Sequence, residues 1–485
     1  MEVINVNKKQ VFNPYLPLYE YVPDGEPHVF NDRVYLYGSH DEAGSVKYCT
    51  GDYVVWSAPI NDLSDWKYEG EVYKATQDPS NTQGKLQLWA PDVARGKDGR
   101  YYLYYCLSFH LEIGVAVSDS PAGPFEFYGH VKYPKNLNDG NVLSDFLPFD
   151  PAIFVDDDDR IFLYYGFAPA ETNPDYPIVP SPGSMVVELE KDMCTTKGIP
   201  TMLIPGGAHS QGTTFQGHAF YEASSMRKIG DTYYFIYSSE LSHELCFATS
   251  KYPDKGFAFG GIIVSNGDLG YNGREKAVNM TGNNHGSIEN INGKWYVFYH
   301  RQTHGTETSR QGCAEQITLL PNGKIEQVEI TSCGLNGGPL KGEGSYSAAI
   351  ACHLTGPSAN GKIIFGQDTK EVLPYIFEES EESHFVANIT NNTVVGFKYF
   401  EFTGLEKISL QIKGKANGTI IIYHHNPEAA ADDSLATKEI KIDEDQAWLT
   451  NEIVLSEPAL KGVYPIYIRY VGEGYINLKT LTFGR

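Results

Sequence analysis

Five short segments of the chain share one pattern, in which a polar turn runs directly into a continuous stretch of aromatic and aliphatic residues. Tight turns that lead into apolar runs are typical of β-hairpins inside a packed sheet. The segments start roughly 60 to 70 residues apart, which is enough for one four-stranded blade and its loops. The five segments are residues 31–37, 98–105, 158–165, 230–237 and 292–299.

The repeat predicts a five-bladed β-propeller over residues 1–335. A β-sandwich also contains recurring hairpins, but one of this length would rarely repeat a single signature five times. The pattern stops near the Gly-rich segment Gly334–Pro339, which indicates a linker. Closely spaced strand-like runs follow, at 393–402, 408–412 and 419–423, and predict a β-sandwich over residues 336–485. The expected fold class is therefore all-β, a five-bladed propeller followed by a β-sandwich domain.

Composition supports this fold and narrows the class of partner. A chain of 485 residues is too long for one ordinary domain, and its 34 tyrosines favour β-structure. The formal net charge of -23 argues against nucleic acid and against an anionic membrane, because phosphate groups would repel it. A neutral oligosaccharide or polysaccharide meets no such repulsion. The oligomeric state stays open.

The N-terminal sequence and the cysteines predict a cytoplasmic location. The first ten residues contain no apolar core or cleavage site, and no stretch is apolar enough to cross a bilayer. The seven cysteines are odd in number and lack metal-type spacing, which predicts buried free thiols in a reducing compartment. A secreted protein whose leader had been removed would look the same.

One ionisable residue precedes each predicted hairpin by eight to ten positions, counted from the end of the turn. The first strand of a propeller blade lines the central channel, so these residues are expected around one axis. Several acids facing one another raise at least one pKa, which usually marks acid/base chemistry or a metal site. The five residues are Asp24, Asp92, Asp150, Glu222 and His285.

Hydrolysis of a glycosidic bond requires such a set of acids. One carboxylic acid protonates the leaving oxygen, while a carboxylate activates water or attacks on the opposite face of the ring. Neighbouring carboxylates keep the acid protonated at working pH.

The segments around these residues resemble glycoside hydrolase family 43, which comprises inverting α-L-arabinofuranosidases and β-xylosidases on a five-bladed propeller. The resemblance covers roughly residues 15–335 and implies Asp24 as general base, Glu222 as general acid and Asp150 as modulator of the acid's pKa. In the family a proline directly follows the general base, whereas Gly25 follows Asp24 in this chain. Aligning Glu26-Pro27 with the family's motif is the alternative register. The matching segments are Pro23–Phe30, Trp89–Asp92, Phe149–Asp157, Tyr221–Lys228 and Gly282–Ser287.

The resemblance also suggests residues that bind substrate or a metal. Trp89 is a candidate sugar platform, and Asp92 is either a substrate contact or a buried structural residue. Arg310 either turns toward the substrate or lies on the surface. His285 matches a residue that often faces a hydrated calcium ion, although a satisfied core histidine is the alternative; calcium prefers oxygen ligands. No organic cofactor is implied.

The C-terminal domain weakly resembles family 6 carbohydrate-binding modules. Trp448 and Tyr423 could stack on a sugar ring, but core packing is the commoner fate of such aromatic residues. A purely structural flank of the propeller is the alternative.

The leading hypothesis is an inverting, exo-acting glycoside hydrolase that releases a terminal pentose, α-L-arabinofuranose or β-D-xylose, from plant hemicellulose. A galactosidase or an endo-arabinanase of the same fold is an alternative within the enzyme class. A non-catalytic carbohydrate-binding propeller would keep the aromatic platforms but lose the acid or the base. A protein-interaction propeller would not need acids on its axis.

Overall fold

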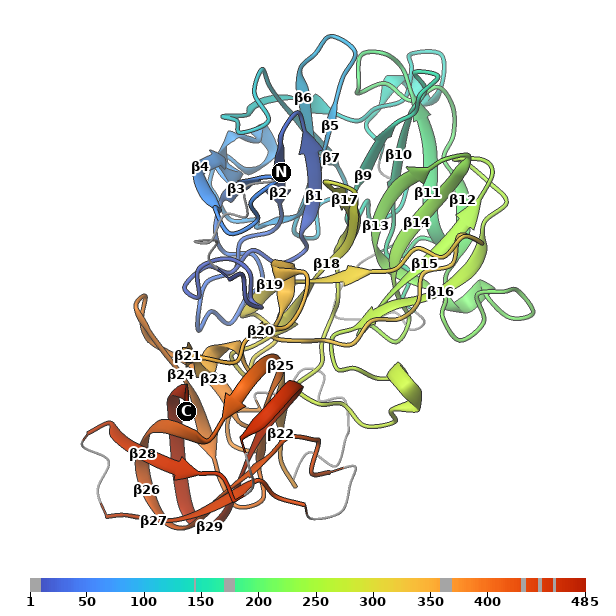
Figure 1. Ribbon diagram of the computed structural model, residues 1–485. Coiled ribbons are helices and arrows are strands. Elements are labelled where there is room, and N and C mark those ends of the chain that lie inside the picture. The colour runs from blue at the N-terminus through green and yellow to red at the C-terminus, as the bar shows by residue number, and fades with distance from the viewer. Residues whose placement is uncertain are drawn as a thin grey trace, which may run out of the picture.

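The computed structural model describes residues 10–143, 145–169, 179–357, 369–428, 433–443, 447–456 and 459–485. Its strands fall into two units that lie one above the other, the N-terminal unit in blue to yellow and the C-terminal unit in orange to red (Figure 1). The first unit is a five-bladed β-propeller and the second is a further β-sheet domain, so the all-β prediction is confirmed.

Each blade of the propeller is an antiparallel sheet whose strands follow one another in chain order. In the described residues the first four blades have four strands and the fifth has three. Blade one is β1 (Glu26–Phe30), β2 (Arg33–Tyr37), β3 (Tyr53–Pro59) and β4 (Lys67–Tyr73). Blade two is β5 (Leu88–Arg95), β6 (Tyr101–Leu107), β7 (Ile113–Ser118) and β8 (Glu126–His130). Blade three is β9 (Ala152–Val155), β10 (Ile161–Tyr165), β11 (Gly183–Leu189) and β12 (Thr201–Pro205). Blade four is β13 (Phe220–Ile229), β14 (Thr232–Ser239), β15 (Glu244–Ser250) and β16 (Ala258–Ser265). Blade five is β17 (Ser287–Ile291), β18 (Lys294–Gln302) and β19 (Arg310–Ile317).

The predicted repeat corresponds to the hairpin between the first and second strand of every blade. In blade one Phe30 pairs with Arg33, and in blade five Ile291 pairs with Lys294. The second strands are buried because they lie in the middle of a blade with another blade packed on either face; every residue of β6 is buried. Continuous apolar runs are what such a position requires.

The first strands of the five blades contact one another in a closed ring, β1 with β5, β5 with β9, β9 with β13, β13 with β17, and β17 with β1. A parallel bridge between Gly25 and Gly286 joins the first and last blades at the start of these strands. This closure brings residues from both ends of the propeller to one axis.

The C-terminal domain is one connected ten-stranded sheet. Its two longest strands, β26 and β29, pair along their whole common length. The predicted division between residues 335 and 336 stays a prediction; it falls between β19 and β20. The strands are β20 (Leu340–Lys341), β21 (Gly344–Ser347), β22 (His353–Thr355), β23 (Tyr375–Ser380), β24 (Ser383–Ile389), β25 (Val394–Leu405), β26 (Lys407–Tyr423), β27 (Ala436–Ile442), β28 (Leu449–Val454) and β29 (Leu460–Gly484).

Short 3₁₀ helices occupy turns of both domains. In the part of the chain that the structure describes they are η1 (Ala75–Gln77), η2 (Pro79–Asn81), η3 (Asn138–Gly140), η4 (Gly207–His209), η5 (Tyr271–Gly273), η6 (Gly334–Asn336) and η7 (Ala348–Ile350). No helix among the described residues is long and apolar enough to span a bilayer.

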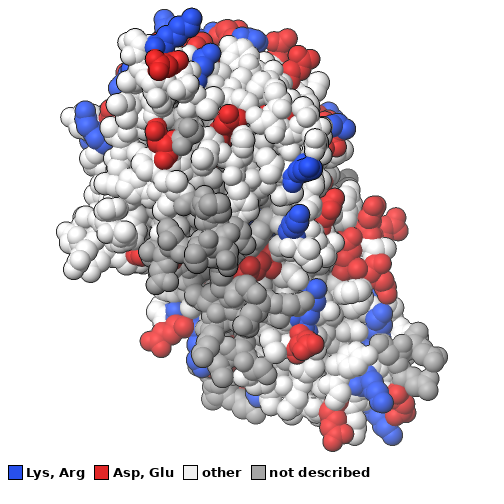
Figure 2. Space-filling model, turned by 180° about the vertical axis from the view of Figure 1, so that it is seen from behind, with Lys and Arg blue, Asp and Glu red and all other residues white. Residues whose placement is uncertain are grey.

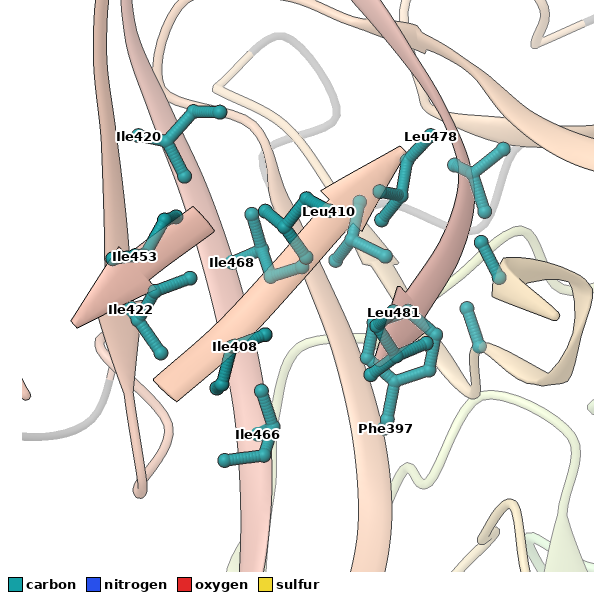
Figure 3. Packing of buried hydrophobic residues seen from close by; sticks show 14 of the residues in the cluster. Phe397, Ile408, Leu410, Ile420, Ile422, Ile453, Ile466, Ile468, Leu478 and Leu481 are labelled. Carbon is teal, nitrogen blue, oxygen red and sulfur yellow. The ribbon is translucent and has the colours of Figure 1, made fainter. Parts of the chain in front are cut away.

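The core of the C-terminal domain comes from alternating positions of its long strands. Ile408, Leu410 and Ile412 on β26 are buried in one cluster with Ile466 and Ile468 on β29. Figure 3 shows Ile408 and Leu410 beside Ile466 and Ile468. Alternation places every second side chain on the same face of a strand, so one face of the sheet encloses the core.

Tyr423 and Trp448, the aromatic residues proposed as sugar platforms in this domain, pack against other side chains. Tyr423 is buried against Val394 and Tyr467, so it belongs to the core. The ring of Trp448 packs on Phe385, and the Lys413 ammonium lies 4.7 Å from the Trp448 ring centroid. The likeness to family 6 carbohydrate-binding modules stays a prediction.

Charged side chains are mixed on the surface. On the described part of the face in Figure 2, Lys and Arg side chains are scattered among acidic and uncharged residues and form no continuous basic surface. The expectation that the protein binds no nucleic acid rests on the net charge of -23 and stays a prediction.

Candidate active site

A cavity of about 210 Å³ lies where the five blades meet at the starts of their first strands. Each blade supplies at least one side chain to it. The lining residues are Asp24, Tyr48, Cys49, Trp89, Ala90, Phe109, Leu147, Phe149, Asp150, Phe167, Tyr221, Glu222, Ser242, Asn283, His285 and Arg310. The structure therefore brings together Asp24, Asp150, Glu222, Trp89, His285 and Arg310 of the residues singled out from the sequence.

Unusual backbone conformations turn the carboxylates into this cavity. Asp24 and Asp150 have left-handed backbones, with φ of 58° and 47°, two residues before β1 and β9 begin. Ala223, which follows Glu222, has φ of 67°, and the β13–β14 register shifts on both sides of Glu222. Such conformations in residues other than glycine cost energy and concentrate at functional sites, and bulges re-aim side chains there.

Asp24 is buried beside cationic and imidazole groups. Its Oδ1 lies 2.9 Å from Arg310 Nη1 and 3.2 Å from His300 Nδ1. Burial by itself would raise the pKa of Asp24, but the Arg310 guanidinium and the His300 and His285 imidazoles outweigh burial and hold the pKa well below its usual range. Asp24 is therefore ionised at neutral pH.

Arg310 is a buried residue, 2% exposed, and not a surface arginine. Its Nε and Nη2 donate to the two carboxylate oxygens of Asp41 at 2.8 and 3.0 Å. Its guanidinium carbon also lies 4.9 Å from the centroid of the Tyr48 ring. A two-pronged contact of this kind fixes the plane of the guanidinium, so Arg310 is held rigidly against Asp24.

Asp150 and His285 form a second buried pair on the axis. His285 Nδ1 lies 3.3 Å from Asp150 Oδ2, which also accepts the backbone N–H of Ala223 at 3.1 Å. Burial lowers the pKa of His285, but the Asp150 and Asp24 carboxylates overcome burial and raise the pKa to about 9. Burial raises the pKa of Asp150, against the pull of His285. The Ala223 contact ties Asp150 to the segment that carries Glu222.

The charged groups around Glu222 shift its pKa in the opposite direction to that of Asp24. It is 6% exposed, and burial, followed by the negative charges of Asp150 and Asp24, raises its pKa to about 8. Glu222 is thus mostly protonated at neutral pH, while Asp24 is ionised in the same cavity. Two carboxyl groups held in different protonation states provide a general acid and a general base.

Aromatic rings form one wall of the cavity. Trp89 packs edge-to-face on Phe109 and Phe149, with ring centroids 4.9 and 5.0 Å apart. Phe149 contacts Phe167, which in turn contacts Tyr221. An aromatic wall of this kind can accept the C–H face of a sugar ring, and the platform role of Trp89 stays a prediction.

Asp92 is not among the residues that line the cavity, and its role as a substrate contact stays a prediction. Its Oδ1 lies 2.7 Å from His28 Nε2, and its Oδ2 accepts the backbone N–H of Ile153 at 2.8 Å. Asp92 is 1% exposed and joins blades one, two and three beneath the cavity. The structural role, the alternative raised from the sequence, explains these contacts.

The described residues do not fit a calcium ion held by protein ligands at His285. His285 faces the Asp150 carboxylate and belongs to no cluster of three ligand atoms among those residues. The cluster that does lie on the axis is Glu26, His28 and Asp92, and Glu26 Oε2 already pairs with the Arg227 guanidinium at 3.0 Å. The Arg227 guanidinium therefore supplies a positive charge to the carboxylates of the axial channel. No role given to a residue of the cavity involves a metal ion.

Sequence reasoning missed much of the cavity. Asp41 and Tyr48, which hold Arg310, lie in the loop between β2 and β3 and follow no repeat. Phe167 and His300 also carry no motif. Tyr221 and Phe149 directly precede Glu222 and Asp150, so adjacency to those residues could have identified them.

Known proteins resemble this chain along its whole length. The family model described as "Glycosyl hydrolases family 43" matches residues 18–325. A "Xylosidase/arabinosidase" of Thermoclostridium stercorarium is 44% identical over 484 residues, which are 98% of this chain and 99% of that protein. "Xylosidase/arabinosidase 43A" of Humicola insolens is 29% identical, covering 63% of this chain and 96% of its own.

A solved structure shares the two-domain fold. The glycoside hydrolase family 43 arabinoxylan arabinofuranohydrolase from Bacillus subtilis, crystallised with cellotetraose, aligns with a TM-score of 0.50 and 20% identity. The alignment covers 98% of this chain and 97% of that one.

Proposed function

Because this chain belongs to glycosyl hydrolase family 43, we propose that it cleaves terminal β-D-xylosyl or α-L-arabinofuranosyl groups from hemicellulose, with inversion at the anomeric carbon. Membership makes the chain a glycoside hydrolase with a carbohydrate substrate. The similarity to xylosidase/arabinosidases favours pentosides over the galactosidase and endo-arabinanase alternatives.

One observation carries the proposal: a single cavity holds two buried carboxyl groups, Asp24 at 2.9 Å from the Arg310 guanidinium and Glu222 among other acids. Glu222 donates its proton to the glycosidic oxygen as the bond from that oxygen to the anomeric carbon breaks. Asp24 takes a proton from the water whose oxygen bonds to the anomeric carbon on the opposite face. The charges of Asp150 and Asp24 help to keep Glu222 protonated, and Arg310 keeps Asp24 ionised.

The shape of the cavity supports a single terminal residue. Its volume is about 210 Å³, and the aromatic wall from Trp89 to Tyr221 closes one side. A non-catalytic sugar-binding propeller would keep the wall but would not need two carboxyl groups with divergent pKa values.

The test is hydrolysis of chromogenic β-xyloside, α-arabinofuranoside and galactoside by the wild type and by Asp24→Ala and Glu222→Ala. We expect pentose release by the wild type and losses of about 10² to 10⁴-fold in both variants. Proton NMR of the first-formed sugar then reports the anomer. A retained anomer would refute inversion, and full activity in either variant would refute its assigned role.

Metal removal tests the calcium ion that the family resemblance implies. Because Arg227, Arg310 and His285 already balance the axial carboxylates, we expect dialysis against EDTA to leave kcat/KM within about twofold of its starting value. A larger loss of kcat/KM that added calcium reverses would contradict this prediction and would indicate a calcium ion near His285.

We also propose that the protein is cytoplasmic. All seven cysteines are buried and unpaired, as their spacing predicts, and free thiols are typical of a reducing compartment. Fractionation of the producing cell tests the location, and recovery of the protein from the medium would refute it.

A further inference from the structure

A side chain of the C-terminal domain reaches the propeller behind Asp24. The Glu378 carboxylate on β23 accepts a short hydrogen bond from the Tyr21 hydroxyl. Tyr21 is 3% exposed and lies three residues before Asp24 in the chain. Its backbone carbonyl accepts the N–H of Asp41, the residue that holds Arg310.

The contact continues to the strand that carries Arg310. The Tyr21 hydroxyl lies 2.8 Å from His304 Nε2, and His304 Nδ1 lies 2.8 Å from Thr303 Oγ1. Thr303 Oγ1 donates to Gln311 Oε1 at 2.7 Å. Gln311 directly follows Arg310 on β19, so a chain of contacts at hydrogen-bonding distance, buried except at Glu378, joins the C-terminal domain to that strand.

Backbone contacts hold the loop that precedes Arg310 against the same domain. The N–H of Ile376 on β23 donates to the Thr303 carbonyl at 3.0 Å. The N–H of Thr369 donates to the Gly305 carbonyl at 2.9 Å. Both loop residues lie between β18 and β19, so the C-terminal domain supports the loop from its outer side.

We infer that Glu378 is a positioning residue for the proposed general base, holding the Asp24 and Arg310 segments together through Tyr21, His304 and Gln311. The two segments meet at the 2.9 Å contact between Arg310 Nη1 and Asp24 Oδ1. The inference rests on the proposed function. It makes the C-terminal domain part of the catalytic unit and not only a flank or a separate sugar-binding module.

The test compares Glu378→Ala with Glu378→Gln, which keeps an acceptor for Tyr21. Glu379→Ala is the matched control, because Glu379 contacts Ser383 and Lys413 within its own domain. The pH dependence of kcat/KM on the pentoside cleaved by the wild type and the unfolding temperature are measured for all three variants.

We expect Glu378→Ala to lose about tenfold to a hundredfold in kcat/KM at neutral pH, since small misplacements of reacting groups have effects of this size. The acidic limb should move to higher pH. The groups that face Asp24 are Arg310, His300 and His285, with Asp150 and Glu222 across the cavity. Of these groups, Arg310 is the one whose position depends on the chain of contacts from Glu378 to Gln311.

The direction of the shift separates positioning from a direct charge effect. Loss of a negative charge at residue 378 would by itself lower the Asp24 pKa, whereas withdrawal of Arg310 raises it. Glu378→Gln should recover most of the activity, and Glu379→Ala should match the wild type. A lower unfolding temperature for Glu378→Ala with an unchanged pH profile would show a merely structural role and overturn the inference.

Failure of the proposed function would be recognised separately. A wild type inactive on every glycoside would refute the function. Carboxyl-carbon NMR titration of Asp24 in the wild type and in Glu378→Ala would then decide the inference, and an unchanged Asp24 pKa would overturn it.

Discussion

At the scale of single residues, the two carboxyl groups proposed to react differ through their neighbours. Asp24 faces the Arg310 guanidinium at 2.9 Å, whereas Glu222 faces the carboxylates of Asp150 and Asp24. Both are buried, so burial raises the pKa of each, and the charged neighbours decide the outcome. The arrangement of charges across blades thus gives the two carboxyl groups opposite pKa shifts, which supports the proposed roles of base and acid.

The pKa of Glu222 sets a testable alkaline limit. Because Glu222 must be protonated to act and its pKa is raised to about 8, kcat/KM should fall as pH rises through about 8. Glu222→Gln should abolish this limb on a substrate whose leaving group needs no protonation, such as a dinitrophenyl glycoside. An alkaline limb that persists unchanged in Glu222→Gln would assign the acid to another group.

At the scale of elements, the starts of the first strands leave no room for additional atoms. Gly286 directly precedes β17, follows His285 in the chain and bridges to Gly25 of blade one. A Cβ at Gly286 would lie 1.9 Å from the Phe298 carbonyl oxygen, which belongs to the fixed backbone of β18. Glycine is required here by close backbone approach.

Gly286→Ala should therefore disturb both stability and the site. Overpacking against backbone is expected to cost about 1–3 kcal/mol of unfolding free energy, and kcat/KM should fall because His285 moves with the strand. Gly198→Ala is the matched control, since a Cβ there meets nothing within 4 Å. Urea denaturation of both variants measures the difference, and equal stabilities would contradict the close approach.

At the scale of the whole molecule, the propeller and the C-terminal domain share buried ionic contacts. Lys398 on β25 is 1% exposed, and its Nζ lies 3.1 Å from Asp268 and 2.9 Å from Glu329 of the propeller. Removing one partner of such a group leaves buried charge without compensation. The two domains should consequently unfold together.

Lys398→Met is expected to destabilise the protein by about 3–5 kcal/mol, because the buried Asp268 carboxylate loses the cation at 3.1 Å and Glu329 keeps, as a cation, only the more distant Arg274. Lys407→Met is the control, since the pair with Glu452 is exposed and such pairs contribute about 0–1 kcal/mol. Calorimetry should show one transition for the wild type. Two separate wild-type transitions, or equal losses in the two variants, would contradict a shared unit.

Local interactions let the sequence determine the repeat, the hairpins and one ionisable residue per blade. Turn residues and apolar runs act over a few positions, so Asn31–Tyr37 and its four counterparts predict their hairpins unaided. Counting back from the turns then identified Asp24, Asp150 and Glu222, because the first strand of each blade meets the axis. The family resemblance supplied their roles, which stay proposals.

Only the tertiary structure decided which of these residues meet. The contact between Asp24 and Arg310 spans 286 positions in the chain, and no local pattern encodes such a distance. Asp92 shares the spacing of the other acids, yet its contacts with blades one and three keep it beneath the cavity. The reach of Glu378 to Tyr21 likewise depends on how two domains pack. Periodicity fixes which face of a strand is buried, whereas long-range packing fixes what that face touches.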